Sequence, residues 1–571
     1  AMDSSKRWLV FPPKPGKASS LPLVQNQACG FTRICTKMPE RHTLVGVSGI
    51  LARLAPPTQE AFPVKRISSK QSRRNSARRK RKVAARHAKA GHWSPRPEPM
   101  FTSGAVHYEV GANTDAMSFG GIAAMHRLVT KLGLPKTIDA KLHLLKVHLP
   151  YHESDHVLNL AYNVMCGGTR LEDIERLRHD TAYMNALGAE LIPDPTTAGD
   201  FCRRFAEADV VELMECINAV RPTLWQGRGR DLLGPIAYID VDGTVAPTDG
   251  QKKAGMDISY KGIWCYAPLI VSLANTEEVL YVVNRPGNAP SHTNAAGWID
   301  KAIDQVTPYA PRVCVRGDTD FSLTEHFDRW AKQVDFLFGM DANRALVTRA
   351  EDLEERDWQR LERKPKYQTL TGQTRHRFQT NEKERIVKER EYINLELNHE
   401  DVAEFDYQPG KCKKPYRVVA LRKNISKMKG EQVLFDEIRY FFYITTRTDL
   451  SAAEVVYCAN ERCDQENVIA QLKSGVNALR VPLYDLVSNW AYMLMATLAW
   501  NLKSWYAMMM HLKSDRLKYM RMEFGRFIHS LILIPCRVVR RARSITVRLI
   551  GYQPTLDRLF STWRTIERIV F

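Results

Sequence analysis

The spacing of apolar residues divides the chain into a helical region and a region of strands. From about residue 117 to residue 224 apolar residues recur at helical spacing, as they do at 156–165 and 210–217. From residue 235 the period becomes that of strands, with runs at 235–242, 264–273 and 279–284. We therefore expect an all-helical domain followed by a sheet.

The next segments alternate between helix and strand. The pattern predicts a helix near 293–306, a strand at 312–318, a helix at 323–333 and a strand at 334–340. Three strands followed by helix, strand, helix and strand indicate an open mixed sheet with flanking helices. This order resembles that of the RNase H fold, in which the first and fourth strands lie side by side.

The rest of the chain varies in character. Residues 345–440 are densely charged with short strand-like runs, which indicates a β-rich insertion, and 460–473 is helical. The apolar run 487–510 is interrupted by polar residues, which favours a buried helix over a membrane span. We expect an α+β multidomain protein, divided into a basic and largely disordered region (1–104), a helical DNA-binding domain (105–230), the first part of an RNase H-like core (231–344), a β-rich insertion (345–445), the second part of that core (446–515) and a basic C-terminal region (516–571).

Charge indicates what such a protein binds. The chain has 571 residues, and its 83 Lys and Arg against 63 Asp and Glu leave a formal charge of +20. Thirteen Lys or Arg and no acid lie between residues 64 and 97, a block that fits a solvated tail or a contact to phosphate backbone. Nucleic acid is therefore the favoured partner, with an anionic membrane or the ribosome as alternatives.

Cysteine usage and the N-terminus bear on the cellular compartment. The eleven Cys are scattered without CxxC pairs, which favours neither a disulfide framework nor a zinc site. The N-terminus lacks the apolar run of a secretory signal. We expect an intracellular protein, cytoplasmic and associated with the nucleoid in a bacterium.

Two aspartates end predicted neighbouring strands. Asp242 ends the first strand, with Asp240 on the same face, and Asp318 ends the fourth, with Asp320 two residues later. Adjacent carboxylates repel each other, and Mg²⁺ is the usual remedy because it prefers carboxylate oxygens. A lone Asp-Gly is more often a turn residue, so the prediction depends on the two positions together. Asp240 remains an alternative to Asp242.

A third carboxylate lies in the predicted helix at 460–473. Arg462 precedes Glu466 by four residues and Lys473 follows it by seven, so the three share one helical stripe. A glutamate between two cations fits a metal ligand flanked by phosphate-binding groups. An exposed helix with ordinary ion pairs would show the same pattern.

Several stretches in order make the chain similar to the DDE transposases, and within them to the insertion-sequence thirteen-eighty family. The resemblance runs from about residue 105 to the C-terminus and is carried by 151–160, 167–178, Pro195-Thr-Thr, Asp242-Gly-Thr, Arg316-Gly-Asp and Gln465-Glu-Asn. It implies a cut-and-paste transposase of a bacterial insertion sequence that acts, as a homodimer, on double-stranded DNA, namely its terminal inverted repeats and a target.

The resemblance also implies the roles of site residues. Asp242, Asp318 and Glu466 would be catalytic and hold two Mg²⁺ ions per site, with Mn²⁺ able to substitute. Arg462 and Lys473 would contact phosphate. The family's signature tyrosine is replaced by Ala459, with Tyr457 nearby, so that role is not assigned.

Four further residues are candidate DNA contacts. Residues 194–205 resemble a helix start, with Thr197 as the cap and Arg203 and Arg204 on the new helix, which is either a recognition helix or an ordinary surface helix. Arg316 is the fourth candidate.

Two other functions remain open. One is a DNA-binding protein without catalysis, and the other is an RNase H-like nuclease or resolvase without strand transfer.

Overall fold

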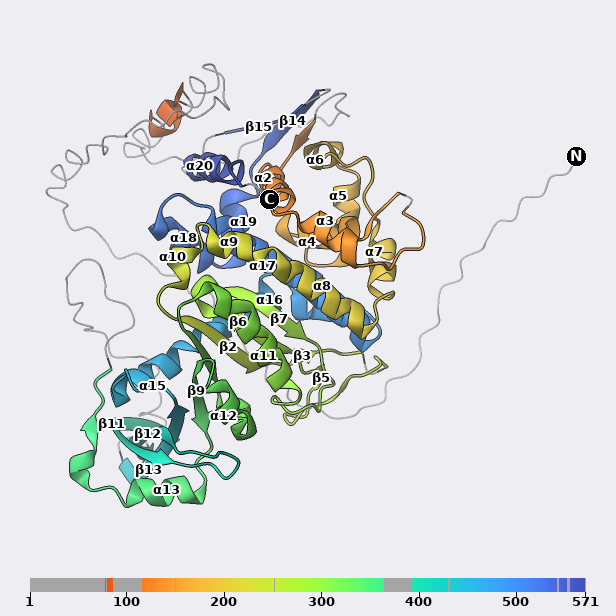
Figure 1. Cartoon of the computed structure of the whole chain (residues 1–571). Coiled ribbons are helices and arrows are strands. Elements are labelled where there is room, and N and C mark those ends of the chain that lie inside the picture. The colour runs from red at the N-terminus through yellow and green to blue at the C-terminus, as the bar shows by residue number, and fades with distance from the viewer. Residues whose placement is uncertain are drawn as a thin grey trace, which may run out of the picture. The chain divides into compact units, whose positions relative to one another are not determined.

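The computed structural model describes residues 77–78, 80–85, 115–148, 150–250, 252–363, 393–429, 432–541, 544–551 and 555–569. Most of the predicted basic region 1–104 lies outside these residues, as does the segment 364–392 within the predicted insertion. The chain divides into two compact units, of which Lys70–Phe571 contains all the elements described below. Figure 1 labels these elements.

Helices dominate the described chain up to Leu233. Most of these helices are amphipathic and bury one face, but α4 is buried along nearly its whole length because it packs against α3 and the later helix α17. The helices are α2 (Ile122–Lys131), α3 (Leu134–Lys141), α4 (Glu153–Met165), α5 (Ile174–Arg178), α6 (Thr181–Leu187), α7 (Pro195–Cys202), α8 (Glu207–Ala219), α9 (Arg221–Gln226) and α10 (Arg230–Leu233).

A mixed sheet follows. Its first five strands in the chain are β2 (Ala237–Gly243), β6 (Leu269–Leu273), β7 (Glu278–Val283), β8 (Val313–Gly317) and β9 (Asp335–Met340), and they lie in the order β7-β6-β2-β8-β9. β2 pairs parallel with β8 and β8 with β9, whereas β6 runs antiparallel to β2 and β7. The first and fourth of these strands are thus neighbours, as predicted.

The single strand predicted at 264–273 is wrong, because it is two strands. β5 (Trp264–Tyr266) pairs with β3 (Ala246–Pro247) and β4 (Asp257–Ile258) in a small separate sheet, and β6 begins only at Leu269. Pro268, at the break, has no N–H with which to continue a ladder.

Helices cover both faces of the large sheet. Ile239 and Val241 of β2 and Val315 of β8 belong to the main core, together with α11 (Ala295–Val306) and α12 (Thr324–Trp330). The intervening residues, such as Cys314, point to the opposite face and pack with α15 (Ala452–Glu461). Because side chains alternate along a strand, Asp240, Asp242, Arg316 and Asp318 all belong to the α15 face.

The β-rich insertion extends this same sheet. Phe442 and Thr445 of β13 pair with Met340 and Leu337 of β9, giving a nine-stranded sheet that runs β10-β11-β12-β13-β9 at this end. The added strands are β10 (Gln359–Arg360), β11 (Ile393–Tyr407), β12 (Tyr416–Lys429) and β13 (Gln432–Thr445), with α13 (Arg344–Glu351) preceding them. The last three of these strands have 14 or 15 residues each and are much longer than the short runs predicted.

The C-terminal part packs around one long helix. The predicted apolar helix is α17 (Leu486–Met508), which is buried against α4, α18 and β7, and in the part of the chain that the structure describes no helix is long and apolar enough to cross a membrane (Figure 1). The predicted basic strand-like tail is a hairpin that pairs with β1. These last elements are α18 (Lys513–Met520), α19 (Phe524–Leu531), β14 (Cys536–Arg541), β15 (Ser544–Leu549), α20 (Leu556–Ile566) and β1 (Ala116–Met117).

Candidate carboxylate site at the ends of two parallel strands

Asp242 and Asp318 lie side by side where β2 and β8 end. Val241 is the register partner of Gly317, and each aspartate follows one member of this pair. The strand end is closely packed, since a Cβ on Gly317 would lie 2.8 Å from the Cβ of Phe321. The Asp318 carboxylate caps the turn Thr319–Phe321 by accepting the Asp320 amide at 3.1 Å. The two predicted aspartates are therefore brought together by the sheet.

The electrostatics of this pair favour a bound cation. Burial raises the pKa of Asp242 to about 6; Arg462 counteracts the rise and Asp318 adds to it. Burial also raises the pKa of Asp318, again opposed by Arg462 and reinforced by Asp320. Arg462 Nη1 donates to Asp242 Oδ2 at 3.2 Å, so this cation offsets part of the repulsion. Two carboxylates that disfavour each other's charge are a suitable pair of ligands for a hard divalent ion.

Asp240 has a different environment from Asp242. Its carboxylate is fully buried and is held by both Arg316 Nε and Nη2, at 2.7 and 2.9 Å. Arg316 is 2% exposed, donates a third bond to the Cys458 carbonyl at 3.0 Å, and lies 4.4 Å from the centroid of the Tyr238 ring. Asp240 is thus already neutralised, which leaves Asp242 as the better placed ligand. The buried position of Arg316 gives no support to a DNA contact.

The predicted helix 460–473 is interrupted. α15 ends at Glu461 and α16 (Asp464–Ser474) follows, with Arg462 and Cys463 between them. Here the amides of Gln465 and Glu466 bond three residues back instead of four, a tighter turn than the α-helix. The prediction that Arg462 and Glu466 share one continuous helix is therefore wrong, although Arg462 still reaches Asp242.

α16 is anchored across the sheet next to the aspartates. Gln465 is 2% exposed, and its Nε2 donates to the carbonyls of Asp240 and Ile270, at 2.9 and 3.1 Å. Burial lowers the pKa of Lys473, as does Lys261, while Asp242 raises it, so Lys473 lies within the field of that aspartate. Sequence reasoning missed the role of Gln465, although it directly precedes Glu466.

Glu466 does not meet the two aspartates in this structure. Its side chain is exposed and has no hydrogen bond or ion pair with another described residue. Within the described ranges, the group of three His, Cys, Asp or Glu side chains close enough to hold an ion is a different one, formed by His148, His152 and Glu153. Asp242 and Asp318 therefore fit a divalent cation as a pair, and the predicted third ligand, Glu466, does not lie beside them.

A further acid near this edge was missed by the sequence analysis. Asp341 directly follows β9, and its charge helps to raise the pKa of Asp318, after burial and Asp320. The signal that could have identified it is the one that identified Asp242 and Asp318, an aspartate placed directly after a predicted strand.

The expected helix start near residue 195 is present but differs in detail. Asp194, not Thr197, is the N-cap of α7: its carboxylate accepts the amides of Thr196 and Thr197 at 2.8 and 2.9 Å. Arg203 and Arg204 are exposed, but they follow the helix instead of lying on it, since Arg203 is the C-cap. Their role as DNA contacts stays a prediction.

Comparisons with known proteins bear on this site. A family model described as a transposase DDE domain, group 1, matches residues 110–570 of the chain. Among solved structures, the chain is similar to a piggyBac transposase in a synaptic complex with hairpin DNA, with 8% identity, coverage of 73% of this chain and 81% of that chain, and a TM-score of 0.35. A search of curated proteins finds no match.

Proposed function

Because the chain belongs to the transposase DDE domain group 1 family, we propose that it is an active transposase of a bacterial insertion sequence, which cuts DNA at the terminal inverted repeats and joins the ends to a target. The observation that carries the proposal is the adjacency of Asp242 and Asp318 at the ends of parallel strands, beside Arg462. A cut-and-paste reaction of the insertion-sequence thirteen-eighty type is part of the proposal.

We infer that β2, β6, β7, β8 and β9 form an RNase H-like catalytic core. The order β7-β6-β2-β8-β9, with only the second strand in the chain antiparallel to its neighbours, supports this inference. In this interpretation β10–β13 are the inserted segment, and the helices α2–α10 form the DNA-binding domain, with Arg203 and Arg204 among its contacts.

Asp242, Asp318 and Glu466 are the proposed ligands of two Mg²⁺ ions, for which Mn²⁺ can substitute. Such ions, when bound, activate water for in-line attack on a phosphodiester and stabilise the departing 3′ oxygen. Glu466 has to move toward the strand ends, and the tight turn at Arg462 and Cys463 is where α16 can change its direction. Arg462, which now bonds to Asp242, and Lys473 then contact the scissile phosphate.

We also propose that the protein works as a homodimer on DNA, because two ends must be processed together. Apolar side chains that are exposed on β11 and β13 support a contact with a second copy, among them Ile393 (64%), Leu395 (49%), Leu397 (49%), Phe435 (50%) and Ile438 (51%). Light scattering of the protein bound to end DNA tests this part of the proposal. We also propose that the protein works in the cytoplasm, on the nucleoid, because its proposed substrates are DNA.

Cleavage of a labelled duplex that carries the terminal inverted repeat tests the function. We expect Mg²⁺-dependent nicking and strand transfer by the wild type, and neither by Glu466→Gln, which retains the shape of the side chain and weakens metal ligation. Equal end binding without cleavage by either protein, in Mg²⁺ and in Mn²⁺, would instead identify a DNA-binding protein. Nicking without joining would identify a nuclease.

A further inference from the structure

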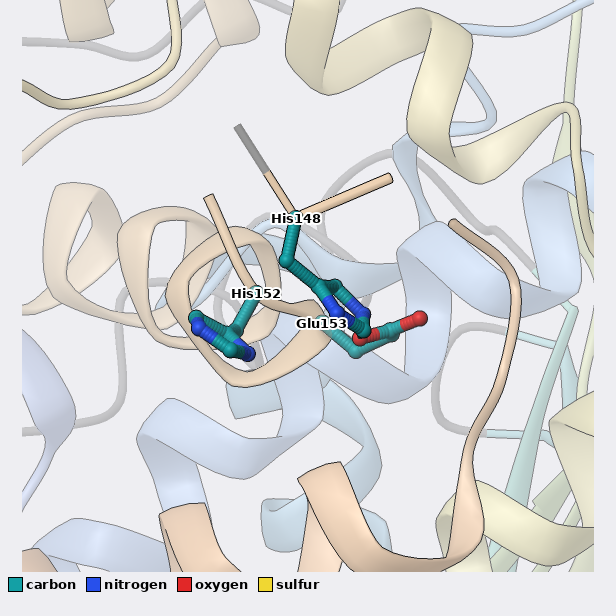
Figure 2. Close-up of side chains that lie close together, drawn as sticks. All are labelled: His148, His152 and Glu153. Atoms are coloured by element: carbon teal, nitrogen blue, oxygen red, sulfur yellow. The ribbon is translucent and has the colours of Figure 1, made fainter. Parts of the chain in front are cut away.

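Two histidines and a glutamate meet at the start of α4, on the helical side of the molecule. His148 Nε2 lies 3.0 Å from Glu153 Oε2, and one ligand atom from each of His148, His152 and Glu153 lies within 4.8 Å of the other two. Figure 2 shows the three side chains gathered beside the first turn of the helix. From this arrangement we propose a transition-metal site, most suited to Zn²⁺, formed by His148, His152 and Glu153.

Glu153 is held in place for such a role. It is 1% exposed, and its Oε1 accepts the amides of Leu144 and Leu145, both at 2.9 Å, which leaves Oε2 directed at the histidines. Two amide donors on one oxygen favour the ionised carboxylate and fix its orientation. A buried anion with one oxygen already satisfied is therefore presented to two imidazoles.

The two imidazoles are free to adjust. Both histidines are exposed, and their rings stack with centroids 4.5 Å apart and planes 12° apart. Nitrogen and oxygen ligands about 2.0–2.1 Å from a tetrahedral ion lie about 3.3 Å from each other. Ring rotations of His148 and His152 can bring the donors to that spacing, and the fourth position would face solvent.

The donor set determines the kind of ion. Two imidazoles and one carboxylate suit Zn²⁺, and in vitro also Co²⁺ or Ni²⁺, whereas Mg²⁺ prefers oxygen ligands alone. The site thus differs chemically from the pair Asp242 and Asp318. His148 and His152 lie in the connection from α3 to α4, and Glu153 is the first residue of α4. The two helices are also joined directly, because the Ser154 amide of α4 donates to Asp139 of α3 at 2.8 Å. A bound ion would fasten this connection to α4, which packs on the central helix α17.

Zinc titration of the full-length, chelator-treated protein tests the site by calorimetry, with Co²⁺ absorption as a second readout. The variant is His148→Ala/His152→Asn, because Asn can still cap α4. The matched control is His143→Ala, which removes an exposed histidine from the same connection. Asp242→Asn separates this site from the proposed catalytic one.

We expect one Zn²⁺ per chain in the wild type, in His143→Ala and in Asp242→Asn. The double variant should bind it at least about 100-fold more weakly, since loss of outer partners alone costs about 10–100-fold. Zn²⁺ should also raise the unfolding temperature of the wild type and leave that of the double variant unchanged. Zinc bound equally by the double variant, or not bound by the wild type, would overturn the proposal, and neither outcome bears on DNA cleavage.

Discussion

Removal of the Arg316 guanidinium should cost far more stability than removal of an exposed arginine from the same strand region. Arg316→Ala leaves the Asp240 carboxylate fully buried without its two bonds at 2.7 and 2.9 Å, and leaves the Cys458 carbonyl without a donor. Breaking a buried ion pair from one side costs about 3–5 kcal/mol. A stability of about 5–15 kcal/mol makes this a large fraction.

The matched control is Arg312→Ala. The Arg312 side chain is 44% exposed and pairs at the surface with Asp335 and Asp449, at 2.8 and 3.2 Å. Surface pairs contribute about 0–1 kcal/mol. Both variants lose an arginine with two acidic neighbours, which for Arg316 are Asp240 at 2.7 Å and Glu461 at 3.6 Å, so the difference between them isolates the effect of burial.

Hydrogen exchange of the amides in β2 and β8 measures this cost locally, in a chain too large for a single two-state transition. We expect the opening free energy of these strands to fall by about 3–5 kcal/mol in Arg316→Ala and by less than about 1 kcal/mol in Arg312→Ala. Arg316→Ala/Asp240→Leu should recover most of the loss, because no buried charge is left unpaired. Equal effects of the two single substitutions would refute the structural role assigned to Arg316.

Three further predictions concern other parts of the molecule. Burial lowers the pKa of His156 to about 4, with Arg204 contributing, so the folded state binds the proton of this histidine more weakly than the unfolded state. The free energy of unfolding should therefore fall by about 3 kcal/mol as the pH decreases from 6.5 to below 4. Urea titrations at several pH values should show a weaker dependence of this free energy on pH for His156→Gln. Gly317→Ala should destabilise the fold by about 1–3 kcal/mol because the new Cβ would meet Phe321, whereas Gly297→Ala, in α11 with open space around it, should stabilise the fold slightly. Unfolding temperatures that change in the same direction for both variants would contradict the packing. Arg537 and Arg548 are paired across β14 and β15. In fluorescence anisotropy, Arg537→Gln/Arg548→Gln should lower by about 2 the magnitude of the slope of log binding constant against log salt concentration. An unchanged slope would exclude this hairpin from the DNA interface.

The elements that carry the site could be predicted because their signals are local. The alternation in β2 and β8 identified both strands, and their order along the chain identified them as neighbours. The position of Asp242 relative to the sheet follows from the same alternation. These features required no knowledge of distant contacts.

The features that sequence reasoning missed are contacts between distant segments or subtle backbone changes. Asp240 and Asp242 share a face, and only the pairing of Asp240 with Arg316, 76 residues away, separates their roles. At the break near Arg462 four backbone amides bond three residues back, and no Gly or Pro in the sequence marks it. Asp194 and Thr197 are both good capping residues, and the choice between them depends on where the chain turns into α7.

Localised cleavage of the polypeptide by Fe²⁺, ascorbate and dissolved oxygen tests whether Asp242, Asp318 and Glu466 come together at one metal site, as proposed. Fe²⁺ in a Mg²⁺ site generates radicals that cut the backbone next to its ligands. With end DNA bound, we expect cuts close to all three residues, suppressed by excess Mg²⁺ and lost in Asp242→Asn. Cuts near Asp242 and Asp318 without one near Glu466, or a pattern unchanged in Asp242→Asn, would contradict it.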